Sequence, residues 1–135
     1  MRPVALTGTV IALCALDLAH KAGGEAAYVH PRSGGYVAFV LVFASAWVAA
    51  ILATGSLSIA VAGGVLAGGA AGNLVSLALW PGVPNPIVLD AVAFNLADLF
   101  VLAGFVLTAT AALVFAVRNR DRLGAPALAS SRRTR

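Results

Sequence analysis

The sequence Gly68-Gly-Ala-Ala-Gly-Asn-Leu74 lies inside a long apolar run and places a polar side chain, Asn73, within it. A second apolar run contains Phe94-Asn-Leu-Ala-Asp98. A polar side chain within an apolar span is energetically costly, so it usually serves packing or function. Asn73 and Asp98 are therefore the first candidate functional residues.

The composition is typical of a membrane protein. Of the 135 residues, 61% are hydrophobic and 10% are charged, and the mean hydropathy is +0.96. Soluble domains carry about 25% charged residues. A chain of this length could not bury so much apolar surface in water, so we expect the bilayer to be its solvent. The single cysteine, Cys14, excludes an intramolecular disulfide and a cysteine-only metal site, and it is expected to be a packing residue.

Apolar segments long enough to span a bilayer predict an all-α membrane protein, a four-transmembrane-helix bundle. The first segment is expected to be a retained anchor, not a cleaved signal peptide. Within the third, Gly64, Gly68 and Gly72 recur every four residues, an interval at which small residues let helix backbones approach closely in lipid. The predicted spans are residues 3–19, 36–53, 57–80 and 96–117.

The segments between and after the spans have different characters. Residues 22–35 show no hydrophobic period, and their glycines and proline suit irregular backbone. The prolines of Pro81-Gly-Val-Pro-Asn-Pro86 end the third helix. The apolar stretch 87–95 either dips into the membrane interface or packs against the bundle, which makes it a short re-entrant or interfacial connector. The transmembrane domain is thus predicted to cover residues 1–118, and the basic tail 119–135 is expected to be cytoplasmic and disordered.

Charge placement predicts the orientation of the bundle. Four spans put both termini on one side, and Arg2 and the arginines of the tail mark that side as cytoplasmic. Only Lys21 and Arg32 fall on the other side. The topology then gathers polar residues near the outer face, namely Asp17, Asn73, Ser76, Asn85, Asp90 and Asp98.

Each of these polar residues also has a purely structural interpretation. Asp98 could cap the last helix, where an acidic side chain suits the helix dipole. Asp17 and Lys21 are four residues apart and could pair with each other, while Asn73 is expected to be a polar clamp between helices. Asp90 could lie in a wet connector. In terms of chemistry, two neighbouring carboxylates can share a proton, so that one acts as base and the other as acid.

Other site classes find no support in the sequence. His20 and His30 lie in or near the first connector without a nucleophile elbow, so a Ser-His-Asp arrangement is not indicated. Zinc-type spacing, a phosphate loop and a dinucleotide fingerprint are absent from the 135 residues. We expect no metal, no cofactor and no nucleic-acid partner.

The ordered motifs resemble those of lipoprotein signal peptidase (signal peptidase II). Residues 68–73 resemble its Gly-Gly-Ala-x-Gly-Asn motif, and residues 94–98 look like its Phe-Asn-x-Ala-Asp motif. Asp17-Leu-Ala-His-Lys21 is similar to the family's Asp-Gln-x-Thr-Lys, and Gly104 follows at the family's distance. Together these motifs cover most of the chain.

The resemblance implies a membrane aspartic endopeptidase of the bacterial cytoplasmic membrane. Such an enzyme removes signal peptides from lipid-modified prolipoproteins at the outer face, using two aspartates. It implies that Asp98 is catalytic, and we expect Asp90 to be its partner. A monomer acting on prolipoprotein among membrane lipids is expected. Further residues are predicted to bind substrate or support the site, namely Asp17, Lys21, Asn73, Asn85 and Asn95.

The sequence departs from the family where the family keeps carboxylates. After Gly-Asn the family continues x-Ile-Asp-Arg, whereas this chain has Leu74-Val-Ser76-Leu77. Asn85 stands where the first catalytic Asp is expected, and Asn cannot ionise. The connector is shorter, and the first loop lacks the family's Asn-x-Gly insert. Two other functions therefore stay open. One is a catalytically impaired descendant that binds lipidated or amphiphilic ligands. The other is a small transporter or proton-coupled membrane protein, which the lack of an internal repeat disfavours.

Overall fold

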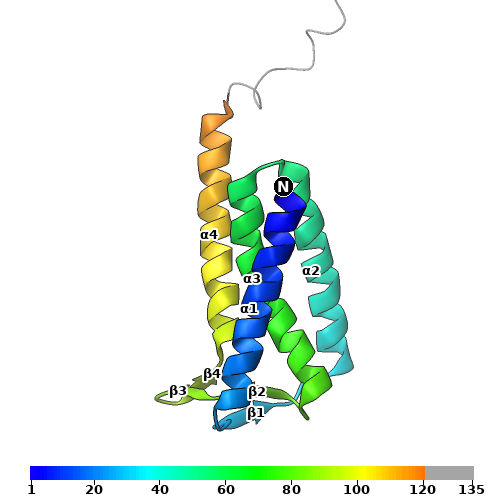
Figure 1. The fold of residues 1–135 in the computed structure, drawn as a ribbon, viewed down its shortest axis with the longest axis vertical. Coiled ribbons are helices and arrows are strands. Elements are labelled where there is room, and N and C mark those ends of the chain that lie inside the picture. Colours follow the sequence, from blue (N-terminus) through cyan, green and yellow to red (C-terminus); the bar gives the residue numbers. More distant parts are fainter. Residues whose placement is uncertain (121–135) are drawn as a thin grey trace, which may run out of the picture.

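A computed structural model describes residues 1–120, in which four long helices lie side by side (Figure 1). All four are long and apolar enough to cross a membrane, so the predicted bundle of four apolar helices is confirmed. The predicted disordered tail, 119–135, lies outside the described residues from position 121 onward. The helices are α1 Arg2–Gly23, α2 Gly34–Thr54, α3 Leu57–Leu79 and α4 Leu96–Arg118.

Helix α3 is the centre of the bundle, and α1, α2 and α4 all pack against it. Its glycines set the distance to α1. A Cβ atom added at Gly64 would lie 2.9 Å from the Cβ of Thr9, and one added at Gly68 would lie 3.0 Å from the Cβ of Leu13. The predicted small-residue seam is therefore confirmed, and its partner is the first helix.

A second close approach joins α3 to α4. A Cβ at Gly69 would collide with the backbone of Ala97, and one at Gly104 would collide with the backbone of Leu66. The two contacts are reciprocal, one glycine coming from each helix. They hold the N-terminal part of α4 closely against the middle of α3.

The connectors contain short strands at the end of the bundle opposite the N-terminus (Figure 1). β1 Tyr28–His30 pairs antiparallel with β2 Val83–Asn85, and β3 Ile87–Leu89 pairs antiparallel with β4 Val92–Phe94. The prediction of irregular backbone throughout residues 22–35 is therefore wrong at β1. A three-residue strand is too short to show an alternating pattern, and the partner of β1 lies beyond two further helices. The connector before α4 is a strand followed by a hairpin.

Candidate functional site

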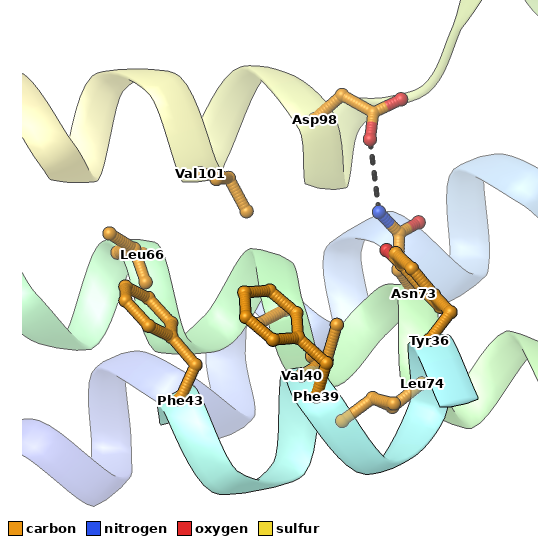
Figure 2. Close-up of a pocket in the computed structure, with 10 residues that line it drawn as sticks. Tyr36, Phe39, Val40, Phe43, Leu66, Asn73, Leu74, Asp98 and Val101 are labelled. Carbon is orange, nitrogen blue, oxygen red and sulfur yellow. Dashed lines mark hydrogen bonds between the residues drawn. The ribbon is translucent and has the colours of Figure 1, made fainter. Parts of the chain in front are cut away.

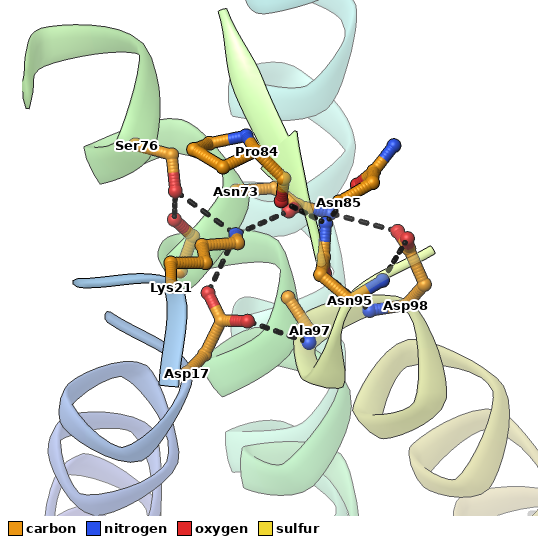
Figure 3. A network of polar contacts seen from close by, with 10 residues as sticks. Asp17, Lys21, Asn73, Ser76, Pro84, Asn85, Asn95, Ala97 and Asp98 are labelled. Carbon is orange, nitrogen blue, oxygen red and sulfur yellow. Dashed lines mark hydrogen bonds and ion pairs between the residues drawn. The ribbon is translucent and has the colours of Figure 1, made fainter. Parts of the chain in front are cut away.

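Most of the predicted polar residues meet at the end of the bundle where the strands lie (Figure 3). They come from α1, α3, β2 and the start of α4, and they form one connected set of hydrogen bonds and ion pairs. The predicted convergence of polar side chains is thus seen for all but one of them, Asp90. The connected residues are Asp17, Lys21, Asn73, Ser76, Asn85, Asn95 and Asp98.

Lys21 lies at the centre of the α1 side of this network. Its Nζ is 2.7 Å from Asp17 Oδ2, and it donates hydrogen bonds of 2.9 Å to Asn73 Oδ1 and to Ser76 Oγ. The side chains of the ion pair are fully buried. The ammonium group thus has an ion-pair partner and two hydrogen-bond acceptors, so its buried charge is compensated on several sides. The predicted Asp17–Lys21 pair is confirmed, and it also joins α1 to α3.

Asp17 has a second role that sequence spacing did not reveal. Its Oδ1 accepts a hydrogen bond of 2.9 Å from the backbone N–H of Ala97, in the first turn of α4. The first N–H groups of a helix have no partner within the helix, and the positive end of the helix dipole favours an anion there. The two residues are 80 positions apart, so no local pattern could have paired them.

Asn73 connects the ion pair to Asp98. Its Oδ1 accepts from Lys21, and its Nδ2 donates to Asp98 Oδ1 at 3.0 Å. Lysine can only donate, so the amide oxygen must face Lys21 and the amide nitrogen is left to face Asp98. The predicted polar clamp is confirmed, and it holds three helices together.

Asn95 and Asp98 form a reciprocal capping box at the start of α4. Asn95 Oδ1 accepts from the Asp98 backbone N–H at 3.1 Å, and Asp98 Oδ2 accepts from the Asn95 backbone N–H at 3.2 Å. The N-cap residue is therefore Asn95, while Asp98 supplies the returning bond. Each carboxylate oxygen of Asp98 therefore accepts one hydrogen bond, Oδ1 from Asn73 and Oδ2 from Asn95.

Asn85, the residue at the expected position of a carboxylate, is joined to Asp98 through Asn95. The Asn95 Nδ2 group donates to Asn85 Oδ1 at 2.6 Å and to Pro84 O at 3.3 Å. Asn85 is buried, with 5% of its surface exposed. An amide therefore occupies this position and serves as a hydrogen-bond acceptor.

Asp90 lies apart from the network. It is exposed at the first position of the two-residue turn between β3 and β4, with a φ of 51°. Asp and Asn tolerate this left-handed conformation better than other non-glycine residues, so the turn by itself accounts for an Asp here. Among residues 1–120, no hydrogen bond or ion pair joins Asp90 to Asp98.

A largely apolar cavity of about 310 Å³ opens next to Asp98, and residues of α2, α3 and α4 line it (Figure 2). Asn73 and Asp98 lie at one end of it and are joined by their hydrogen bond. Asp98 is the acidic residue of this lining within the described part of the chain. The apolar wall is formed by residues of three helices, mainly Phe39, Val40, Phe43, Leu66, Leu74 and Val101.

The α2 side of the cavity is aromatic. Phe39 and Phe43 stack with ring centroids 6.1 Å apart, and Phe43 and Trp47 stack at 5.9 Å. Phe39 is 67% exposed, so an apolar ligand could cover it. Sequence reasoning missed this wall because α2 is apolar along its whole length. The recurrence of aromatic residues at intervals of three and four was the signal available.

No group of three or more His, Cys, Asp and Glu residues able to hold a metal lies within residues 1–120. No family model matches the chain, and no match is found among curated proteins or among solved structures. The relationship to signal peptidase II therefore stays a prediction that rests on the sequence motifs.

Proposed function

We propose that this protein binds an amphiphilic, lipid-modified peptide in the cavity between α2 and α4, as a catalytically impaired relative of signal peptidase II. The observation that supports it is a single carboxylate, Asp98, which lies beside Asn73 at the polar end of a largely apolar cavity in the described residues. Asp98 can accept a hydrogen bond from an N–H of the peptide. The acyl part of the ligand packs against the aromatic wall of α2.

Binding is favoured over hydrolysis because peptide cleavage of the aspartic type needs two carboxylates that share a proton. Asp90 is exposed at the tip of a hairpin. Asp17 is engaged by Lys21 and by the N-terminus of α4. Asn85 occupies the remaining nearby position and cannot take up a proton as a base does. Asp98 thus has no acid–base partner among the described side chains.

In this proposal the site faces outward from a bacterial cytoplasmic membrane. The N-terminus and the strand-bearing end lie at opposite ends of the bundle (Figure 1). Arg2 and the arginines beyond Arg118 are expected to stay in the cytoplasm. This orientation places Asp98 near the outer surface, where a lipid-modified peptide could reach it from the membrane.

The proposal is tested by titrating the purified protein in nanodiscs with a fluorescent peptide that carries a diacylglyceryl cysteine. The wild-type chain should bind it saturably. Ala70→Phe, which fills the cavity, should weaken binding at least tenfold, equivalent to about 1.4 kcal/mol. Ala46→Phe makes the same change at an exposed position of α2 and should bind normally. Equal binding by all three proteins would rule the cavity out.

The same peptide distinguishes binding from cleavage. Bound ligand should be recovered intact after long incubation with the wild-type protein. The chain should also fail to restore prolipoprotein processing in cells that lack signal peptidase II. Processing by the wild-type chain would instead establish the endopeptidase function that the resemblance implies.

A further inference from the structure

The β3–β4 hairpin exposes apolar side chains on both of its faces. Val88, Leu89 and Val92 are 54%, 65% and 62% exposed. In the antiparallel register Ile87 lies opposite Phe94 and Leu89 opposite Val92, so these four side chains share one face. The one charged residue between positions 87 and 94 is Asp90, at the turn. A protruding apolar hairpin of this kind would promote association in water, so we expect another apolar surface to pack against it.

The hairpin lies at the level where the helices leave their apolar region. It projects sideways from the foot of α4 (Figure 1). At the same end of the bundle, Tyr36 stands in the first turn of α2 and Trp80 directly follows α3. Tyr and Trp gather at membrane–water interfaces. For a hairpin that extends sideways at this level, the nearest apolar surface is the part of the lipid leaflet close to the headgroups.

The backbone limits how deep the hairpin can lie. Within the described residues β3 pairs with β4 alone, so its other edge presents unpaired N–H and C=O groups. Such groups are not tolerated in the hydrocarbon core, where neither water nor headgroups can reach them. The charge of Asp90 sets the same limit. The boundary between headgroups and acyl chains satisfies both the apolar side chains and the polar edge.

We propose that the β3–β4 hairpin is a lateral membrane anchor that rests in this boundary, with Ile87, Leu89, Val92 and Phe94 on its acyl-chain side. Phe94 directly precedes Asn95, the N-cap of α4. The anchor therefore holds the Asn95–Asp98 capping box at a constant height relative to the lipid. It does not depend on which ligand the cavity takes.

The test places nitroxide spin labels at single cysteines in a Cys14→Ala background, with one copy of the protein in each phosphatidylcholine nanodisc. Leu89→Cys and Val92→Cys report on the hairpin. Ala26→Cys, in the exposed connector after α1, is the matched control. Collision rates are measured with oxygen, which concentrates in lipid, and with a water-soluble nickel chelate. The oxygen-to-nickel ratio should be several-fold higher at positions 89 and 92 than at 26.

Two results would overturn the anchor. A ratio at 89 and 92 equal to that at 26 would place the hairpin in water. Low collision rates with both reagents would show that protein covers it. Leu89→Trp, combined with Trp47→Phe and Trp80→Phe, gives a second measurement that needs no label. Its fluorescence should be quenched more by lipids brominated near the glycerol than by lipids brominated near the chain ends, and absence of quenching by either would again place the hairpin in water.

Discussion

Lys21 and Asn73 are joined by a hydrogen bond of 2.9 Å, and this bond decides which end of the Asn73 amide meets Asp98. Lysine offers donors only, so the amide oxygen turns toward α1 and the amide nitrogen toward α4. The buried Asp17–Lys21 pair thereby orients an amide that lines the cavity, although neither residue of the pair lines the cavity itself. A substitution at Lys21 should therefore change both the stability of the protein and the hydrogen bond between Asn73 and Asp98.

Lys21→Met should destabilise the protein by about 3–5 kcal/mol, because it leaves Asp17 buried without its counter-ion. The measurement is the free energy of unfolding in detergent. The double variant Asp17→Asn/Lys21→Met removes both charges and should recover part of the loss. A double variant no more stable than Lys21→Met would contradict the argument that the unpaired charge is the cause.

Asn95→Ala should cost more stability than Asn95→Ser by about 1 kcal/mol, because serine keeps the N-cap acceptor and alanine does not. Both variants lose the amide donor to Asn85, so their difference isolates the cap. Thermal unfolding of the two proteins under identical conditions measures it. Equal stability would mean that Asp17, which also binds the first turn of α4, makes the Asn95 cap redundant.

Gly104→Ala should destabilise the bundle by about 1–3 kcal/mol, because the new methyl group would press on the backbone of Leu66 in α3. Gly8→Ala is the matched control in α1, where nothing lies within 4 Å of the added atom. That change should be neutral or stabilising by about 0.5–1 kcal/mol, since alanine suits a helix interior better than glycine does. Similar effects of the two changes would show that α3 and α4 do not pack closely at this point.

Asp98→Asn should weaken binding of the lipid-modified peptide by roughly tenfold or more, because hydrogen bonds to a charged group contribute about 1.5–3 kcal/mol. Asp90→Asn is the control, and it should leave affinity unchanged because Asp90 is exposed on the hairpin turn. Titration of both variants in nanodiscs measures the difference. Loss of binding in the Asp90 variant alone would show that the hairpin, and not the cavity, holds the ligand.

Under the proposed binding function, Asn85→Asp should introduce slow cleavage of the lipid-modified peptide, which the wild-type chain is expected to bind and leave intact. The new carboxylate can still accept the hydrogen bond from Asn95 Nδ2, so the local fold should persist. It would also add a second carboxylate near Asp98, because Asn95 donates one hydrogen bond to position 85 through its side chain and another to Asp98 through its backbone N–H. Mass spectrometry of the peptide detects the product, and Asn85→Asp/Asp98→Asn should abolish it. Cleavage that survives in that double variant would come from another group or a contaminant.

Local spacing was enough to predict part of the site. Asp17 and Lys21 were expected to pair because residues four apart share a helix face, and the pair is present. Asn73 was expected to clamp helices because an amide in an apolar span needs a partner. Asp90 could not be placed in this way. An acidic residue in a short connector reads the same in the sequence whether it faces a site or turns a hairpin.

The sequence by itself determined the four apolar helices and the glycine seam of α3, because both follow from residue type at a repeating interval along one chain segment. It also determined that polar side chains would meet at one end of the bundle, since the topology alternates the direction of the spans. Only the tertiary structure decided which of them touch. The bond from Ala97 to Asp17 and the separation of Asp90 from Asp98 depend on how closely α4 approaches α3 and on where β3 turns back, and these distances arise between segments far apart in the chain. For the same reason only the tertiary structure reveals what residues 68–73 contact. Gly68 packs against α1 and Gly69 against α4, while Asn73 forms hydrogen bonds to both helices.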